Sequence, residues 1–293
     1  MPELPEVETI VRQLAPRVEG RRLERVDVLD ARWCRPLTPG ELRGALVGRT
    51  VERLWRRGKY LVWELGELFL LMHLRMTGTL LYDPASPTGH ARARLELDDG
   101  HRLVVCDPRR FGTAELAPGP QAAEDFLTAR LGVEPLGPGF TESHLRALAR
   151  GRRAPVKALL LDQRRIAGVG NIYADEALFR ARIHPMRPAG RLTAAQLREL
   201  RRAVMSSLRA GIGAGGATID DYRDADGVQG SFQDQFLVHR RAGEPCPRCG
   251  ATIVKLVAAG RGTYACESCQ PRPRRRRPAL AQRSASSSSS RPF

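Results

Sequence analysis

Near its C-terminal end the chain carries two cysteine pairs separated by sixteen residues, Cys246-Pro247-Arg248-Cys249 and Cys266-Glu267-Ser268-Cys269. Two Cys-x-x-Cys pairs at this spacing are typical of a zinc ribbon, in which each pair supplies two thiolate ligands from one tight turn. Because four cysteines leave no coordination position for a catalytic water, the motif predicts one structural Zn²⁺. The metal would stiffen the hairpin between the pairs, residues 253–264, which is too small to fold alone.

The composition is strongly basic. The chain has 293 residues, with 48 Lys and Arg against 32 Asp and Glu and a formal net charge of +16. Seven arginines and no acid fall in residues 272–293, an Arg-rich and then Ser-rich segment that we expect to be a disordered tail. Residues 1–271 still carry +9, which favours a polyanionic partner such as nucleic acid. On the hairpin, Lys255 and Arg261 are either phosphate contacts or solvated surface cations.

Composition also excludes several classes of protein. Hydrophobic residues make up 42% of the chain, which excludes wholesale disorder. No apolar run approaches the roughly 18 residues of a membrane span, and the acidic start of the chain lacks the features of a signal peptide. We therefore expect a soluble, cytoplasmic protein with no membrane partner. In a reducing compartment the paired cysteines favour a metal over disulfides, and Cys34 and Cys106 are expected to be ordinary buried thiols.

Residues 1–115 are predicted to be mostly β-strand, in an antiparallel sandwich or barrel. Two strand-turn-strand patterns indicate this, residues 61–63 with 68–72, and residues 95–97 with 103–106 around Asp99-Gly100. One early helix is expected at residues 6–14, where apolar side chains recur on one face.

After a segment dense in Pro and Gly, residues 117–140, the pattern becomes helical. The predicted helices are 142–149 after the cap Thr141, 156–161 with Pro155 in the first turn, two segments flanking a glycine-rich turn at 168–171, and a long helix from Thr193 that ends before Gly211. Residues 211–230, rich in Gly and Asp, are expected to form a mobile loop.

The N-terminus carries a chemical signal. Removal of Met1 would leave Pro2 with a free secondary amine, and an α-amino group has a reference pKa of about 7.7–8.0 against about 10.4 for lysine. A secondary amine that attacks an aldehyde carbon gives an iminium without needing a further proton, so Pro2 is a candidate covalent nucleophile. Glu3 and Glu6 lie close enough to donate a proton or to orient it. The alternative is that Pro2 merely begins the chain and that the acids cap the first helix.

Three more motifs precede the cysteine pairs: Pro2–Glu8, Asp107–Gly112 and Gly168–Ala174, which read PELPEVE, DPRRFG and GVGNIYA. The four motifs, in this order, closely resemble the bacterial formamidopyrimidine-DNA glycosylase family over residues 2 to 271. The resemblance implies an α+β protein with an N-terminal antiparallel β-sandwich domain and a C-terminal helical domain with a helix-two-turn-helix element and a four-cysteine zinc finger. The expected domains are the β-sandwich at residues 1–133, the helical domain at 134–230 with a lesion-capping loop at about 217–229, the zinc finger at 231–271 and the tail at 272–293.

The same resemblance implies a function. Members are bifunctional base-excision repair enzymes that remove oxidised purines, chiefly 8-oxoguanine opposite cytosine and formamidopyrimidines, and then cut the strand at the abasic site. The expected partner is double-stranded DNA that contains such lesions or abasic sites, and a monomer is expected. Pro2 matches the Schiff-base nucleophile, Glu3 the proton donor, Lys59 the lysine assigned to β-elimination and Arg261 the arginine assigned to δ-elimination. Glu6 would orient the nucleophile or cap its helix.

An enzyme that acts on a base inside duplex DNA must extrude that base and fill the space it leaves. By resemblance, Met76, Arg109 and Phe111 are the filling group, although the sequence alone would more often place Met76 and Phe111 in a core. His90 and Arg153 match DNA-binding positions, and His73 and Asn171 match phosphate contacts; for the two histidines, a polar residue at a strand end is the alternative. Lys157 lies either beside the target nucleotide or on an exposed helix face.

Two other functions fit parts of the sequence. The endonuclease VIII branch shares the fold and the nucleophile but favours oxidised pyrimidines; it typically has Gly where this chain has Leu4. A noncatalytic zinc-ribbon DNA-binding protein would explain the charge and the cysteines, but it would not explain Pro2-Glu3 together with Lys59.

Overall fold

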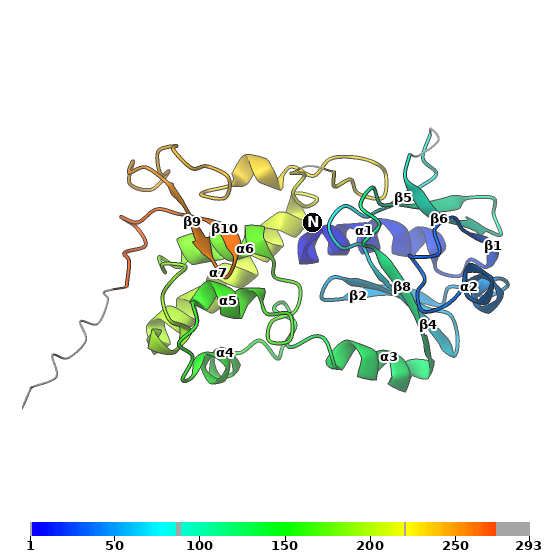
Figure 1. Cartoon of the computed structure of the whole chain (residues 1–293), viewed down its shortest axis with the longest axis horizontal. Helices are drawn as coiled ribbons and strands as arrows, with labels where there is room; N and C mark the ends of the chain where they lie inside the picture. The colour runs from blue at the N-terminus through cyan, green and yellow to red at the C-terminus, as the bar shows by residue number, and fades with distance from the viewer. Residues whose placement is uncertain (1, 86–88, 220, 274–293) are drawn as a thin grey trace, which may run out of the picture.

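The computed structural model describes residues 2–85, 89–219 and 221–273 (Figure 1). A β-sheet half built from the N-terminal residues lies beside a helical half that also carries the C-terminal hairpin. The proposed tail lies outside the described residues from position 274 onward. Among the described residues, no helix is both long enough and apolar enough to cross a bilayer.

The N-terminal half contains two four-stranded antiparallel sheets, in the orders β1-β6-β7-β5 and β2-β3-β4-β8. The expected hairpins are confirmed, because Val62 pairs with Leu71 and Leu95 pairs with Leu103. The strands are β1 (Leu23–Val28), β2 (Arg53–Arg57), β3 (Tyr60–Glu64), β4 (Leu68–His73), β5 (Thr79–Tyr82), β6 (Ala91–Leu97), β7 (Arg102–Cys106) and β8 (Thr113–Pro118).

Helix α1 (Leu4–Val18) packs into the core of this half. Its side chains Val7, Ile10 and Leu14 are fully buried in one cluster with residues of both sheets. The helix begins two residues before the predicted 6–14, because a proline in the first turn has no N–H that needs an intrahelical acceptor, and it continues beyond residue 14 to Val18. Pro2 and Glu3 therefore lie directly at a helix N-terminus. The half is completed by α2 (Pro39–Leu46) and α3 (Gly119–Thr128).

The C-terminal half is helical, as expected, and its elements are α4 (Glu142–Ala149), α5 (Val156–Leu161), α6 (Asn171–Arg180) and α7 (Ala194–Gly213), with short 3₁₀ turns at Ala189–Arg191 and Phe232–Gln235. Both predicted threonine caps are confirmed, since Thr141 Oγ1 accepts the His144 N–H and Thr193 Oγ1 accepts the Gln196 N–H. Pro155 is the residue before α5 rather than a member of its first turn.

The predicted end of the long helix is wrong, because α7 runs through Gly211 to Gly213. A Cβ on Gly211 would lie 2.4 Å from the ring of Tyr173 on α6, so this glycine allows two helices to pack closely and does not stop the helix. The segment that follows α7 contains few regular elements among its described residues, although Ala217 makes an isolated bridge with Ser231.

The zinc-ribbon hairpin consists of β9 (Val254–Ala258) and β10 (Arg261–Ala265), paired antiparallel. It packs against α6 (Figure 1), whose first turn lies against the start of α1. Two glycines make this approach possible. A Cβ on Gly168 would lie 2.7 Å from Leu4, and one on Gly170 would lie 2.2 Å from the Glu3 carboxylate. The chain therefore brings the N-terminus of α1 against the N-terminus of α6.

Candidate active site

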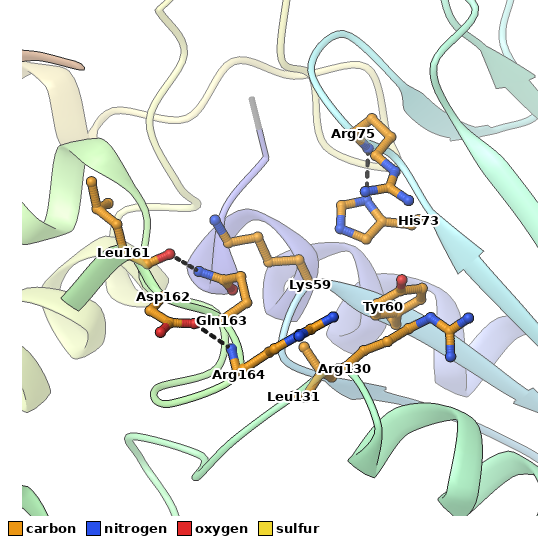
Figure 2. A pocket seen from close by; sticks show the side chains of 10 residues that line it. All are labelled: Lys59, Tyr60, His73, Arg75, Arg130, Leu131, Leu161, Asp162, Gln163 and Arg164. Atoms are coloured by element: carbon orange, nitrogen blue, oxygen red, sulfur yellow. Dashed lines mark hydrogen bonds between the residues drawn. The ribbon is translucent and has the colours of Figure 1, made fainter. Parts of the chain in front are cut away.

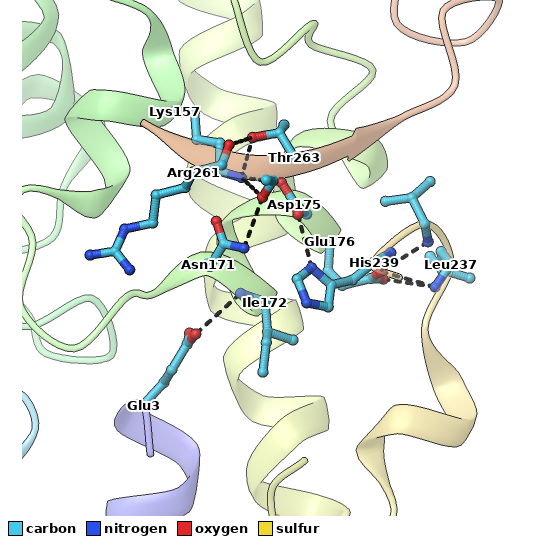
Figure 3. A network of polar contacts seen from close by, with 12 residues as sticks. Glu3, Lys157, Asn171, Ile172, Asp175, Glu176, Leu237, His239, Arg261 and Thr263 are labelled. Carbon is cyan, nitrogen blue, oxygen red and sulfur yellow. Dashed lines mark hydrogen bonds and ion pairs between the residues drawn. The ribbon is translucent and has the colours of Figure 1, made fainter. Parts of the chain in front are cut away.

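Glu3 joins the two halves of the molecule. Its backbone N–H donates to Glu6 Oε2 at 2.7 Å, and its Oε1 accepts the Ile172 N–H at 3.1 Å (Figure 3). The side chain is only 2% exposed, and Oε2 has no hydrogen-bond partner within the described residues. One oxygen is thus fixed by a free N–H at the start of α6, while the other has no partner among the described residues.

Glu6 is buried in the first turn of α1. Its Oε1 accepts from the Tyr173 hydroxyl at 2.7 Å and from the Ala217 N–H at 2.8 Å. Burial raises the pKa of Glu6, and the charge of Glu3 raises it further, against the lowering effect of these hydrogen bonds. Because both oxygens of Glu6 are occupied within the fold, the geometry favours an orienting role over proton exchange.

Lys59 follows Gly58 in the turn between β2 and β3, and the carboxylate of Glu134 holds this turn. Glu134 accepts the Gly58 N–H at 2.5 Å and pairs with Arg56 at 2.9 Å and with Arg57 at 3.2 Å. Gly58 has a φ of +59°, which favours glycine. Glu134, in the segment that joins the two halves, therefore fixes the conformation of the turn that carries Lys59.

The Lys59 side chain is 5% exposed and extends from this turn toward the start of α1 (Figure 2). Burial lowers the pKa of Lys59, and Arg261 lowers it further, while the carboxylates of Glu3 and Glu6 raise it. A larger fraction of the amine is therefore neutral near pH 7 than for an exposed lysine, which suits a group that removes a proton.

A cavity of about 530 Å³ lies between the two halves. Its wall combines cationic, polar and apolar side chains, and it is lined by Lys59, His73, Arg75, Met76, Phe111, Thr113, Leu161, Gln163, Val169, Gly170, Asn171 and Arg261. An adjoining cavity of about 490 Å³ shares Lys59 and His73 (Figure 2). The described residues thus bring Lys59, His73, Asn171 and Arg261 together from four different elements.

Asn171 and Arg261 form one wall of this cavity. Asn171 Nδ2 donates to the Gly262 carbonyl at 3.0 Å, which ties α6 to β10, while its Oδ1 is buried with no partner among the described residues. Arg261 is exposed at the start of β10, and Figure 3 shows its side chain extending away from the buried network. No ion pair of Arg261 occurs within the described residues, so its guanidinium can meet an anion.

His73 lies at the end of β4. Its Nδ1 accepts the Arg75 N–H at 2.9 Å, and its ring meets Tyr60 edge to face at 4.7 Å (Figure 2). Burial lowers the pKa of His73 to about 3, with smaller effects of Arg75 and Lys59. The neutral ring therefore carries its proton on Nε2 and presents a hydrogen-bond donor to the cavity.

Met76 and Phe111 are exposed rather than in a core, with 40% and 50% of their surface accessible. The Arg109 guanidinium carbon lies 4.8 Å from the centre of the Phe111 ring. His90 and Arg153 are also exposed, but neither lines the cavity that contains Lys59. The structure thus gathers Met76 and Phe111 at the cavity and leaves the other two outside it.

Lys157 is fully buried, so the alternative of an exposed helix lysine is wrong. Its Nζ donates to Asp175 and to Thr263 Oγ1, both at 2.7 Å, and Asp175 also contacts His239 (Figure 3). The side chain lines none of the cavities described here and instead ties α5 and α6 to β10. This network fixes the strand that carries Arg261.

The four paired cysteines fit a zinc ion. Their sulfur atoms all lie within 4.8 Å of one another, with 3.9 Å between Cys246 and Cys269 and 3.5 Å between Cys249 and Cys266. A thiolate tetrahedron with a Zn–S distance of about 2.3 Å has edges of about 3.8 Å. Cys34 and Cys106 lie outside this group and are buried, as expected.

Two acids that shape the site were missed from the sequence, Glu134 and Asp107. Asp107 is 1% exposed and its carboxylate accepts backbone N–H groups of the loop that carries Arg109 and Phe111. The sequence contains Asp107 as the first residue of the motif at 107–112, but it does not show which groups the Asp107 carboxylate contacts. Glu134 had no local signal, because its partner Gly58 lies 76 residues away.

Comparison with known proteins defines the family. The family model "Formamidopyrimidine-DNA glycosylase N-terminal domain" matches residues 1–114, the H2TH domain of the same glycosylase matches residues 131–223, and "Zinc finger found in FPG and IleRS" matches residues 243–272. The formamidopyrimidine-DNA glycosylase of Chloroflexus aurantiacus is 47% identical over 275 residues, which cover 92% of this chain and 98% of the relative.

Solved structures agree. The Lactococcus lactis Fpg in complex with DNA containing an abasic site has a TM-score of 0.86 at 35% identity, over 92% of this chain and 100% of that one. The MutM (Fpg) protein of Thermus thermophilus has a TM-score of 0.83 at 44% identity, over 92% and 98%. Fold and site define a zinc-finger DNA glycosylase of base-excision repair. The chain belongs to the formamidopyrimidine-DNA glycosylase family, whose members are both glycosylases and abasic-site lyases.

Proposed function

We propose that the protein excises oxidised purines from double-stranded DNA, chiefly 8-oxoguanine opposite cytosine and formamidopyrimidines, and then cuts the strand by β- and δ-elimination. The observation that carries the proposal is a cavity lined by Lys59, Asn171 and Arg261, with the α1 N-terminus held next to it by the bond from the Ile172 N–H to Glu3. The charges of Glu3, Glu6 and Arg261 all act on Lys59. A structure of the Lactococcus lactis relative holds DNA with an abasic site, the product that base excision would give.

The first stage is base excision with covalent capture. The Pro2 nitrogen bonds to C1′ while the glycosidic bond breaks, and the base leaves with the bonding electrons and takes up the proton that the Pro2 nitrogen loses. A proton from Glu3 to the sugar ring oxygen lets the ring open, and the nitrogen lone pair then completes a C1′ iminium. The unpartnered Oε2 of Glu3 supports this role, because it is the oxygen that the fold leaves unused.

The second stage is strand cleavage. The iminium acidifies C2′, so that loss of its proton expels the 3′ phosphate; a second elimination expels the 5′ phosphate, and water then releases the sugar from Pro2. Lys59 serves the first elimination and Arg261 the second. The lowered pKa of Lys59 supports proton removal, and the exposed guanidinium of Arg261 supports stabilisation of a departing phosphate.

The remaining candidate residues would hold the duplex. His73 through its Nε2–H and Asn171 at the start of α6 would contact phosphates, and His90 and Arg153 would bind DNA outside the cavity. The space of the extruded nucleotide would be filled by Met76, Arg109 and Phe111. Exposed apolar side chains can stack on bases, and the Arg109 guanidinium lies beside the Phe111 ring.

The wider assignments follow from the same function. We propose that residues 1–133 act as the catalytic β-sandwich, 134–230 as the DNA-binding helical domain with its loop, and 231–271 as the finger. We further propose that the protein acts as a monomer in the bacterial cytoplasm, where its DNA substrate lies.

Borohydride trapping tests the proposal. The protein, with Met1 shown to be removed, is incubated with duplexes that contain 8-oxoguanine opposite cytosine, an oxidised pyrimidine or no lesion, and borohydride is added. The proposal predicts a covalent adduct on the 8-oxoguanine duplex and none on undamaged DNA. Trapping on the pyrimidine alone would favour the endonuclease VIII specificity, and no adduct on either lesion would reject covalent catalysis.

A further inference from the structure

The buried carboxylate of Asp107 connects two loops at the edge of the cavity. Its Oδ1 accepts the Thr77 hydroxyl at 2.5 Å and the Arg109 N–H at 3.2 Å. Its Oδ2 accepts the Phe111 N–H at 2.8 Å and the Gly112 N–H at 2.7 Å. One side chain that is 1% exposed thus binds the loop that carries Arg109 and Phe111, and also the loop in which Met76 precedes Thr77.

These two loops need such a connection because their tips have little packing to hold them. Met76 and Phe111 are 40% and 50% exposed, so the positions of these side chains depend on the backbone beneath them. Thr77 is half-buried, and its hydroxyl provides the link between the two loops. The loop that carries Met76 is otherwise closed on itself by the Gly78 N–H to Leu74 carbonyl bond of 3.0 Å.

The sheet in turn anchors the backbone of Asp107. The Asp107 N–H donates to the His90 carbonyl at 3.0 Å, and Arg92 Nε donates to the Asp107 carbonyl at 2.8 Å. Arg92 lies in β6 and Asp107 directly follows β7. The carboxylate of Asp107 therefore holds both loops in a fixed position relative to the sheet.

We propose that Asp107 is a positioning residue that makes Met76, Arg109 and Phe111 enter the duplex as one unit, and that the Thr77 hydroxyl is the link between the loops. This inference rests on the proposed function, in which these three side chains fill the space left by the extruded nucleotide. The bonds from Asp107 to its own loop already shape that loop. The bond to Thr77 adds the coupling between insertion of Met76 and insertion of the other two.

The test uses Thr77→Val, which removes the hydroxyl at nearly constant volume, and Thr77→Ser, which restores it. Thr128→Val, at the exposed end of α3, is the matched control. The full-length variants are mixed with a duplex that has 8-oxoguanine in one strand and 2-aminopurine beside the opposite cytosine. Stopped-flow fluorescence then gives the insertion rate, and single-turnover excision is also measured on a duplex whose lesion faces a one-nucleotide gap.

The inference predicts that Thr77→Val slows insertion and excision on the intact duplex roughly tenfold, the effect of one lost hydrogen bond to a charged group. Excision opposite the gap should be unchanged, because the lesion has no base pair there and its extrusion does not need the filling side chains to replace one. Thr77→Ser and Thr128→Val should behave like the wild type. Equal rates for Thr77→Val and wild type on the intact duplex would overturn the inference, as would equal losses on both substrates. An inactive wild type would instead reject the proposed function.

Discussion

The Glu3 carboxylate accepts the backbone N–H of Ile172 at 3.1 Å, which fixes the first residues of α1 against the first turn of α6 (Figure 3). This bond crosses from one half of the molecule to the other. It aligns the proposed nucleophile and the cavity wall through a single side chain, and it leaves the second oxygen of Glu3 for chemistry.

The first prediction concerns Glu3→Gln. The amide oxygen can still accept the Ile172 N–H, but the side chain can no longer donate an acidic proton. Single-turnover excision should fall about 100-fold, while the dissociation constant for lesion DNA stays within a few-fold. Glu67→Gln, on the exposed β3–β4 turn, is the matched control. Excision at the wild-type rate would show that Glu3 transfers no proton.

The second prediction concerns Glu134, which holds the turn before Lys59. Glu134→Ala removes the acceptor of the Gly58 N–H and leaves Arg56 and Arg57 without this partner. Strand cleavage at a preformed abasic site should lose about tenfold in kcat with little change in KM, because Lys59 is misplaced rather than removed. Glu134→Gln keeps one acceptor and should be intermediate. A change in KM alone would contradict a role in positioning Lys59.

The third prediction follows from the burial of His73, which lowers its pKa to about 3. In the unfolded chain the His73 imidazole titrates near pH 6.5. Between about pH 3 and pH 6.5 the unfolded chain therefore binds more protons than the folded one. His73 therefore favours the folded state fully above about pH 6.5, and this contribution is lost as the pH falls toward 3.

The free energy of unfolding of wild type minus that of His73→Gln should be constant above about pH 7 and should decrease as the pH falls below 6.5. Denaturant titration at several pH values measures this difference. The His73 ring should also show no NMR titration between about pH 5 and 8. A ring that titrates near 6.5 would contradict the neutral Nε2–H donor.

The fourth prediction concerns zinc. Removal of the metal by a chelator should unfold the β9–β10 hairpin, because the four cysteines lose the ion that links them and the hairpin has little core of its own. Affinity for DNA should fall, since Arg261 is carried by β10. Added Zn²⁺ should restore both binding and the amide protection of the hairpin. Equal DNA affinity of the metal-free protein would contradict this account.

Local patterns predicted much of this fold. The two β-hairpins, the caps Thr141 and Thr193 and the zinc hairpin each depend on residues close together in the chain, so their signals survive without tertiary information. Resemblance supplied the residues around the cavity, and their proposed roles remain predictions.

What the sequence did not show depends on contacts between distant segments. Glycine often marks the end of a helix, but Gly211 lies inside α7, where the lack of a side chain lets Tyr173 of α6 pack against it. Lys157 has the pattern of a surface lysine, yet Asp175 and Thr263 satisfy its charge in the interior. Such pairings appear only when distant segments of the C-terminal half pack together.

Peptide mapping of the borohydride-trapped complex tests whether Pro2 is the covalent nucleophile. The adduct formed with 8-oxoguanine duplex is digested with protease and nuclease, and the modified peptide is sequenced by mass spectrometry. The account predicts that the sugar remnant is found on the nitrogen of Pro2 in the N-terminal peptide. A remnant on Lys59, or on any other lysine, with an unmodified Pro2 would contradict it.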